Sequence, residues 1–342
     1  MTQTLPSTID PYRQIIDTLS PCKRVLVTTH VRPDGDALGT CVALILGMRK
    51  VGINAELLVL SRLPRKYAFV VETNAITHHD AEPGWPVALN DLSRFDAFVS
   101  CDTGTWSQLP GLKERIIPWN VPKLVIDHHL TQEDWATAKL VIKVASAAGE
   151  IVAELLDQWG IPIDADIGGA IFLAIASDTG WFQFANTRPY TFRLAARLIE
   201  AGVDTDKMYQ LLFQNERAER VALQTRAQQS LELIADGRIA VMQVRKADFQ
   251  ETRGDVADTE NLINIPLQIQ TVQASVLLTE PLDGGAIRVS LRSKGQVDVA
   301  RFAERFGGGG HARASGLRIE GTLQQAHDTV VKAMVEAVGS RQ

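Results

Sequence analysis

Three short apolar runs in the first half of the chain end in polar residues. They are KRVLVTTH at 23–30, FDAFVSCD at 95–102 and KLVIDHH at 123–129. Each run is rich in Val, Leu, Ile or Phe without strict alternation of apolar and polar positions, which is typical of strands covered on both faces. Helical patterns follow at 37–51 and 147–159. The pattern predicts an α/β fold built on a parallel sheet.

The polar residues stand where these strands end. In open parallel sheets, ligands gather beyond the carboxyl ends of the strands. We therefore expect residues that are far apart in the sequence to converge on one crevice: His30, Asp34, Asp36, Asp102, Asp127, His128 and His129. A further apolar helical run, IGGAIFLAIA, leads into SDTGWF and adds Asp178 to this set.

The chain length indicates two domains, because 342 residues exceed what one hydrophobic core usually organises. Residues 1–213 are expected to form the parallel-sheet domain. The charge-rich stretch QNERAERVALQTRAQQS predicts a solvated helical connector over 214–230. Strand-like runs RIAVMQV, VQASVLL and AIRVSLR, with a final helix near 323–338, predict a second, smaller α/β domain over 231–342.

Composition and charge narrow the classes of partner. The net charge of -5 offers no broad basic surface, so tight binding of long duplex nucleic acid is not expected. The N-terminus lacks the regions of a signal peptide, and no run of eighteen apolar residues occurs, so we expect a cytoplasmic protein without a membrane partner. The three cysteines form no CxxC pair, which predicts neither a disulfide framework nor a cysteine zinc site.

The residues at the strand ends offer oxygen and nitrogen ligands without sulfur, which suits Mn²⁺ or related divalent ions. Gly35 permits a tight turn, so Asp34 and Asp36 can face different ions. These two aspartates, clustered with Asp102 and Asp178, would repel one another unless cations balanced their charge. Two divalent ions about 3.5 to 4 Å apart can hold a shared water as hydroxide and stabilise charge at phosphorus. The set therefore predicts phosphoester hydrolysis.

A plainer interpretation exists for single members of the set. An aspartate at a strand end often caps a helix, and Asp36 could cap the helix that begins at Ala37. The complete set, with its adjacent histidine pair, favours a metal site. The other histidine pair, His78 and His79, has no apolar strand before it and predicts a polar loop.

Four segments, HVRPDGDALG, SCDTG, VIDHH and ASDTGWF, resemble in order and spacing the motifs of the DHH phosphoesterase superfamily. The resemblance runs from about Val25 to Phe182. It implies two divalent metal ions, with Mn²⁺ expected and Mg²⁺ or Co²⁺ as alternatives. One implied ligand set is His30, Asp34 and Asp102. The other is Asp36, Asp102, His128 and Asp178, with Asp102 bridging the two ions.

The same resemblance implies catalytic roles for two further residues. Asp127 would orient the site from behind the ligands. His129 would face the substrate phosphate, where it assists proton transfer or stabilises charge; the sequence leaves both roles open.

The segment RFGGGGHARASG at 305–316 carries the chemistry of the second domain. Its glycines would let backbone amides approach a ligand, and its His and Arg side chains can pair with phosphate. With the Arg-Ser pair upstream, it is similar to the nucleic-acid-binding domain that accompanies DHH in nanoRNases and RecJ-like nucleases. The implied substrate-binding residues are Arg292, Ser293, Gly308, Gly309, Gly310, His311 and Arg313. Ser315 stands where an alanine is common.

A metal site in one domain and a glycine loop in the other favour a short nucleotide chain held between them. The layout is most similar to that of the NrnA-type oligoribonucleases. This implies hydrolysis of short single-stranded RNA to mononucleotides, and of 3'-phosphoadenosine 5'-phosphate to AMP. Three alternatives stay open: a linear or cyclic dinucleotide phosphodiesterase, a manganese inorganic pyrophosphatase and a non-catalytic nucleotide sensor. A homodimer is also left open.

Overall fold

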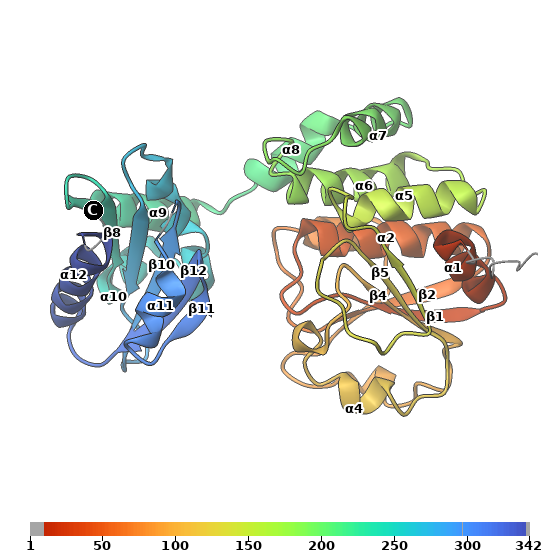
Figure 1. The fold of residues 1–342 in the computed structure, drawn as a ribbon, viewed down its shortest axis with the longest axis horizontal. Helices are drawn as coiled ribbons and strands as arrows, with labels where there is room; N and C mark the ends of the chain where they lie inside the picture. Colours follow the sequence, from red (N-terminus) through yellow and green to blue (C-terminus); the bar gives the residue numbers. More distant parts are fainter. Residues whose placement is uncertain (1–9, 296, 340–342) are drawn as a thin grey trace, which may run out of the picture. The chain divides into compact units, whose positions relative to one another are not determined.

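The computed structural model describes residues 10–295 and 297–339. The chain forms two compact units that meet in sequence between Asn215 and Glu216. Figure 1 shows the helices and strands of each unit, coloured along the sequence.

A six-stranded parallel sheet forms the centre of the first unit, in the order β3-β2-β1-β4-β5-β6. Its strands are β1 (Arg24–Thr28), β2 (Asn54–Val59), β3 (His78–Asp80), β4 (Ala97–Cys101), β5 (Lys123–Asp127) and β6 (Ala138–Val141). Strands β2 and β3 follow β1 on one side of the sheet, and β5 and β6 follow β4 on the other. Strands β1 and β4 therefore flank a topological switch point. The predicted parallel α/β sheet is confirmed, and the ends of β1, β4 and β5 are neighbours.

The strands of this sheet are buried on both faces. Val25 and Val27 of β1 point into the larger core, and Leu26 points into the smaller one. The helices on the larger core are α1 (Pro11–Leu19), α2 (Gly35–Lys50), α5 (Ala148–Gln158) and α6 (Ala165–Asp178). The smaller core is covered by α4 (Lys113–Ile116) and the loops around it. Two covered faces explain why the strand sequences are almost continuously apolar.

Helix α2 is buried on all sides. It lies between the sheet and α6, so every residue from Gly35 to Met48 is buried. Gly39 permits the close contact with α6, because a Cβ atom there would lie 2.4 Å from the carbonyl oxygen of Ala170. The cap considered for Asp36 is formed instead by Asp34, whose Oδ1 accepts a 3.0 Å hydrogen bond from the amide of Ala37.

Shorter elements complete the first unit. They are α3 (Ala68–Thr73), α7 (Pro189–Glu200), α8 (Thr205–Phe213), and the 3₁₀ turns η1 (Val87–Leu89) and η2 (Trp106–Gln108). The loop predicted at His78 and His79 is wrong, because these residues pair with β2 as strand β3. Strand β3 is short and polar, and Nε2 of His79 lies 2.7 Å from Oε2 of the buried Glu56. No apolar run in the sequence therefore predicts this strand.

A second six-stranded sheet organises the second unit, in the order β11-β12-β10-β9-β8-β7. Strands β8 and β9 are parallel, and the other neighbours are antiparallel. The strands are β7 (Glu232–Ile234), β8 (Ile239–Val244), β9 (Ala274–Thr279), β10 (Ile287–Ser293), β11 (Gly309–His311) and β12 (Ala314–Ile319). One face carries α11 (Val299–Glu304) and α12 (Leu323–Gly339). The other carries α9 (Ala218–Gln229), α10 (Lys246–Thr252), and the 3₁₀ elements η3 (Val256–Thr259) and η4 (Leu262–Gln268).

Helix α9 corrects the expectation of a solvated connector over 214–230. Leu223 and Ala227 are fully buried and pack with Met242 and Leu277 of the sheet. The helix is therefore part of the second unit. Its sequence is rich in charge because only these two residues of the helix are buried.

A helix that spans a bilayer needs about 20 predominantly apolar residues. Over residues 10–295 and 297–339, no helix is both long enough and apolar enough to do so.

Candidate metal centre

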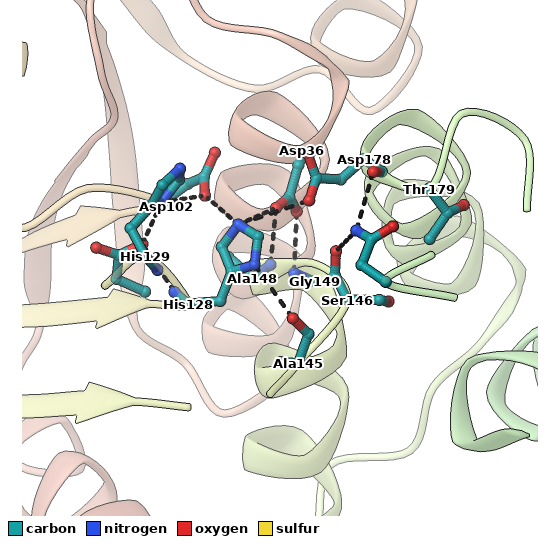
Figure 2. A network of polar contacts seen from close by, with 12 residues as sticks. Asp36, Asp102, His128, His129, Ala145, Ser146, Ala148, Gly149, Asp178 and Thr179 are labelled. Atoms are coloured by element: carbon teal, nitrogen blue, oxygen red, sulfur yellow. Dashed lines mark hydrogen bonds and ion pairs between the residues drawn. The ribbon is translucent and has the colours of Figure 1, made fainter. Parts of the chain in front are cut away.

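The residues predicted as metal ligands meet at the carboxyl ends of β1, β4 and β5. Each of these strands is followed by one of them: His30, Asp102 and His128. The N-terminus of α2 and the C-terminus of α6 supply the rest: Asp34, Asp36 and Asp178. Figure 2 shows four of these side chains turned toward one another. The structure thus assembles the complete predicted set from segments that are remote in sequence.

One group of potential ligand atoms joins His30, Asp34 and Asp102. Nε2 of His30 lies 3.9 Å from Asp34 Oδ1 and 3.5 Å from Asp102 Oδ2. Nδ1 of the same ring lies 3.1 Å from the carbonyl oxygen of Val31, which can only accept, so in the neutral ring the proton belongs on Nδ1. The lone pair of Nε2 then faces the carboxylates. The separations are near the roughly 3 Å expected between two ligands of one cation bound at about 2.1 Å.

A second group joins Asp36, His128 and Asp178. Nδ1 of His128 faces the carbonyl oxygen of Ala145 at 3.2 Å, which again directs Nε2 toward carboxylates. Nε2 lies 3.6 Å from Asp36 Oδ2 and 3.7 Å from Asp178 Oδ2. It also lies 3.3 Å from Oδ1 of Asp102. Asp102 therefore offers one oxygen to each group.

Asp102 provides a test of whether these residues suit a cation. Its side chain is 3% exposed, and within the described part of the chain no group donates a hydrogen bond to Oδ1. A buried carboxylate oxygen left without a donor is costly. Its backbone also adopts the left-handed region, with φ of 58°. A buried carboxylate oxygen that accepts no hydrogen bond, with other oxygen and nitrogen ligand atoms close by, suits a hard divalent cation.

Hydrogen bonds from α5 and from α2 itself fix the orientation of Asp36. The amides of Ala148 and Gly149, in the first turn of α5, donate to its two oxygens at 2.7 and 3.1 Å. The hydroxyl of Thr40 donates to Oδ1 at 2.9 Å. Since α5 begins there, its positive end also favours the negative charge of the carboxylate.

A further network holds the segments around Asp178. The side-chain amide of Asn186 donates to the carbonyl oxygens of Asp178 and Ser146, at 3.1 and 3.0 Å. Ser146, just before α5, donates through its amide and its hydroxyl to the buried Glu150. Arg188 forms an ion pair with the same carboxylate. No sequence pattern predicted these residues, although Asn186 shortly follows the segment ASDTGWF.

The ionisation of the site reflects its concentrated negative charge. Burial raises the pKa of Asp36 well above its usual range, and the charge of Asp102 adds to this effect. Burial likewise raises the pKa of Asp178 to about 6. Burial of the His30 ring disfavours its charged form, yet the adjacent carboxylate of Asp102 raises its pKa to about 9. A bound cation would take the place of these protons.

Asp127 lies behind the cluster and supports it. It is fully buried at the end of β5, and its Oδ1 accepts from the amides of His128 and His129 at 2.7 and 3.1 Å. The same oxygen accepts from Nδ1 of His129 at 2.8 Å. This bond raises the pKa of His129, whose side chain is 56% exposed. His129 thus combines a fixed ring with access to solvent.

The predicted residues of the second unit lie in different settings. Arg292 and Gly308 line a groove of about 570 Å³. The hydroxyl of the buried Ser293 donates to the carbonyl oxygen of Val297 at 2.6 Å, and the guanidinium of Arg313 donates to that oxygen at 3.1 Å. The exposed strand β11 carries Gly309, Gly310 and His311.

Two glycines of the loop serve the packing of the sheet. A Cβ atom at Gly308 would lie 2.3 Å from the carbonyl oxygen of Gly316, and one at Gly310 would lie 2.5 Å from that of Ala314. At Gly309 a Cβ atom would meet nothing within 4 Å, so the approach to a ligand is free there.

Two family models match the chain. The model of the DHH family, N-terminal domain, matches residues 24–175, and the DHHA1 domain model matches residues 236–340. The chain therefore carries a DHH-family domain followed by a DHHA1 domain. The resemblance drawn from the four motifs is thereby confirmed, and the first unit is the DHH domain and the second the DHHA1 domain.

Proteins from three bacteria are similar to this chain over most of its length. It is 27% identical over 314 residues to the bifunctional oligoribonuclease and PAP phosphatase NrnA of Thermus thermophilus, covering 91% of this chain and 89% of that protein. It is 24% identical over 309 residues to the protein of the same name from Bacillus subtilis, covering 90% and 92%. The cyclic-di-AMP phosphodiesterase PdeA of Listeria monocytogenes is 26% identical over 332 residues, but this chain covers 47% of its length.

Solved structures show the same fold. The crystal structure of an exopolyphosphatase-related protein from Bacteroides fragilis superposes with a TM-score of 0.83 at 22% identity, covering 99% of this chain and 98% of that one. The crystal structure of exonuclease RecJ bound to manganese gives a TM-score of 0.52 at 17% identity, covering 97% and 94%. This chain therefore shares its fold with solved structures.

Proposed function

We propose that this chain hydrolyses short single-stranded oligoribonucleotides to mononucleotides, and 3'-phosphoadenosine 5'-phosphate to AMP, with two Mn²⁺ ions. The chain is a phosphoester hydrolase of the DHH family, and the proposal concerns its substrates and its ions. One observation carries it: Asp102 offers one buried oxygen to each of two ligand groups, and the one facing the second group accepts no hydrogen bond within the described residues.

The ligand groups define which residues would hold the ions. One ion would take Nε2 of His30 with carboxylate oxygens of Asp34 and Asp102. The other would take Nε2 of His128 with oxygens of Asp36, Asp102 and Asp178. When bound, such ions lower the pKa of a water molecule and stabilise charge on a phosphoryl group.

His129 supplies the acid chemistry of the proposed reaction. Its Nδ1 donates to Asp127, which stabilises the charged imidazolium and raises the pKa of the ring. The exposed ring can then donate a proton to the leaving oxygen, or balance the charge of the phosphoryl oxygens. Asp127 keeps the ring oriented and acts only through it.

The relatives support the choice of substrate. Two proteins that match 91% and 90% of this chain are named bifunctional oligoribonuclease and PAP phosphatase. The groove in the DHHA1 domain, where Arg292 and Gly308 lie, is a place for a nucleotide. A dinucleotide phosphodiesterase is the second candidate, because the Listeria cyclic-di-AMP phosphodiesterase matches over both domains of this chain.

A panel of substrates tests the proposal. With Mn²⁺, we expect turnover of RNA of two to five nucleotides and of 3'-phosphoadenosine 5'-phosphate, and none in Asp102→Asn. Linear and cyclic dinucleotides and pyrophosphate complete the panel. Turnover restricted to the cyclic dinucleotide would establish the second candidate, and turnover restricted to pyrophosphate would contradict both.

A further inference from the structure

The groove of the DHHA1 domain holds more positive charge than the predicted substrate residues account for. Besides Arg292, it is lined by Arg288 and Arg318, which the motifs do not include. Arg288 and Arg292 lie on the same side of β10, since side chains two and four positions apart share a face. Along the strand they are about 14 Å apart, at about 3.4 Å per residue. That length exceeds what a single phosphate can bridge.

Arg288 and Arg318 are direct partners across the antiparallel strands β10 and β12. Like charges placed opposite each other destabilise a sheet. Within residues 10–295 and 297–339, neither guanidinium forms an ion pair or a hydrogen bond with another residue, so the repulsion is not offset by an acidic neighbour. Such a pair is expected where an anion completes the arrangement.

The floor of the groove between the arginines is made of small residues. Ser290 is paired with Gly316 across the same two strands. A Cβ atom at Gly316 would meet only a backbone oxygen of Val289, at 3.4 Å, so this part of the floor is low. The lining residues include one aromatic ring, that of Phe306, and a single acidic side chain, that of Glu260. Positive charge with one aromatic ring suits a nucleotide more than an inorganic anion.

We propose that Arg288 and Arg318 form a phosphate subsite that binds an internucleotide phosphate of the substrate, apart from Arg292 and the glycine loop. The subsite rests on the proposed function and deepens it, because it assigns residues to the recognition of chain length. A substrate with a second internucleotide phosphate gains this contact. A mononucleotide bisphosphate seated at Arg292 and the loop does not reach it.

Binding measurements test the subsite separately from catalysis. In the inactive Asp102→Asn background, the affinity for a fluorescein-labelled pentaribonucleotide is measured by anisotropy, with and without Arg288→Gln and Arg318→Gln together. We expect the double change to weaken binding about 10-fold or more, because two charge-assisted contacts are lost. The dependence of log affinity on log salt should become shallower by about 0.7, the value for one phosphate of a single strand.

Lys332→Gln is the matched control. It removes a positive charge from the exposed side of α12, which covers the opposite face of the sheet. We expect it to leave pentaribonucleotide binding unchanged. The double arginine change should also leave Tm unchanged or raise it, since it removes repulsion between paired strands. Pentaribonucleotide binding equal to that of Lys332→Gln would overturn the subsite, as would a loss of binding explained by a fall in Tm.

Turnover by the otherwise unchanged enzyme separates the two proposals. With Arg288→Gln and Arg318→Gln, KM for the pentaribonucleotide should rise while turnover of 3'-phosphoadenosine 5'-phosphate stays the same. If the arginines matter for RNA binding but no RNA is hydrolysed, the subsite stands and the proposed substrate fails. If RNA is hydrolysed with an unchanged KM, the subsite fails and the proposed function stands.

Discussion

The backbone amide of Ala148 donates a 2.7 Å hydrogen bond to Oδ2 of Asp36. This bond links the first turns of α5 and α2, two helices far apart in the sequence. Since Asp36 takes its orientation from α5, whatever positions the start of α5 also positions a candidate metal ligand. Ser146, which precedes the helix, is in turn held by Asn186 and Glu150.

Asn186 is therefore expected to control metal affinity without contacting the metal. Asn186→Ala removes the donor that joins the carbonyl oxygens of Asp178 and Ser146. Loss of such supporting bonds typically weakens metal binding 10- to 100-fold. Titration calorimetry with Mn²⁺ measures the effect, and Asn90→Ala, an exposed loop change, is the control. Equal Mn²⁺ affinity in the two variants would show that Asn186 only stabilises the fold.

Asp102→Asn should abolish turnover while preserving the backbone. Asn tolerates the left-handed φ of 58° that Asp102 adopts, whereas Ala at the same position adds a backbone cost of about 1 kcal/mol or more. We expect turnover to fall at least about 1000-fold in both variants, because one residue serves both ligand groups. Urea unfolding without metal should separate them, with Asp102→Ala the less stable. Near-normal turnover in Asp102→Asn would contradict the shared ligand.

The metal-free protein should lose stability as the pH rises. Burial raises the pKa of Asp178 to about 6, above the value near 4 of an unfolded carboxyl group, so its protonation stabilises the fold and this gain is lost from about pH 4 to 6. For His30, burial opposes protonation but Asp102 raises the pKa to about 9. Its contribution is complete below about pH 6.5 and is lost as the pH rises through 9.

Divalent ions and protons compete for the same side-chain atoms, so protonation of these residues weakens metal binding. The rise in Tm on adding Mn²⁺ should therefore grow between about pH 5.5 and 8.5, because the ligands must be deprotonated to bind. Thermal melts with Mn²⁺ and with a chelator, at each pH, measure this difference. A difference that is constant across the range would argue against ligands with raised pKa values.

Two glycine substitutions test the close packing of α2 against α6. At Gly39 a Cβ atom would collide with the carbonyl oxygen of Ala170, so Gly39→Ala should lower the free energy of unfolding by about 1 to 3 kcal/mol. At Gly169, within α6, a Cβ atom meets nothing within 4 Å. Gly169→Ala should therefore raise the stability by up to about 1 kcal/mol through helix propensity. Urea unfolding measures the free energy of unfolding of both variants, and we expect the two changes to have opposite signs.

The sequence predicted the candidate ligands because their placement follows from topology. Polar residues at the ends of buried parallel strands must share one edge of the sheet, so His30, Asp102 and His128 could be grouped without a structure. Asn186 could not be found in this way. Its partners, Ser146 and the carbonyl group of Asp178, are backbone acceptors, and backbone acceptors leave no pattern in a sequence.

Burial explains the other differences between prediction and structure. Strand β3 is an edge strand with polar side chains, and α9 buries only two residues, so neither carries an apolar signal. Ser293 faces the opposite side of β10 from Arg292 and its hydroxyl donates to the carbonyl oxygen of Val297, and its contact with the substrate stays a prediction. Side chains of adjacent strand residues point to opposite faces, so only one residue of an Arg-Ser pair can face the groove.

The spread of the candidate ligands along the chain determines when each ligand group is complete during synthesis. The six candidate ligands range from His30 to Asp178, and both ligand groups draw on segments that emerge at different times during synthesis. A nascent chain that ends before α6 has β1, β4 and β5 but lacks Asp178, and one that ends before β4 lacks the aspartate that both groups need. The group of His30, Asp34 and Asp102 is therefore complete once the residue after β4 has been made, whereas the group of Asp36, His128 and Asp178 is complete only at the end of α6.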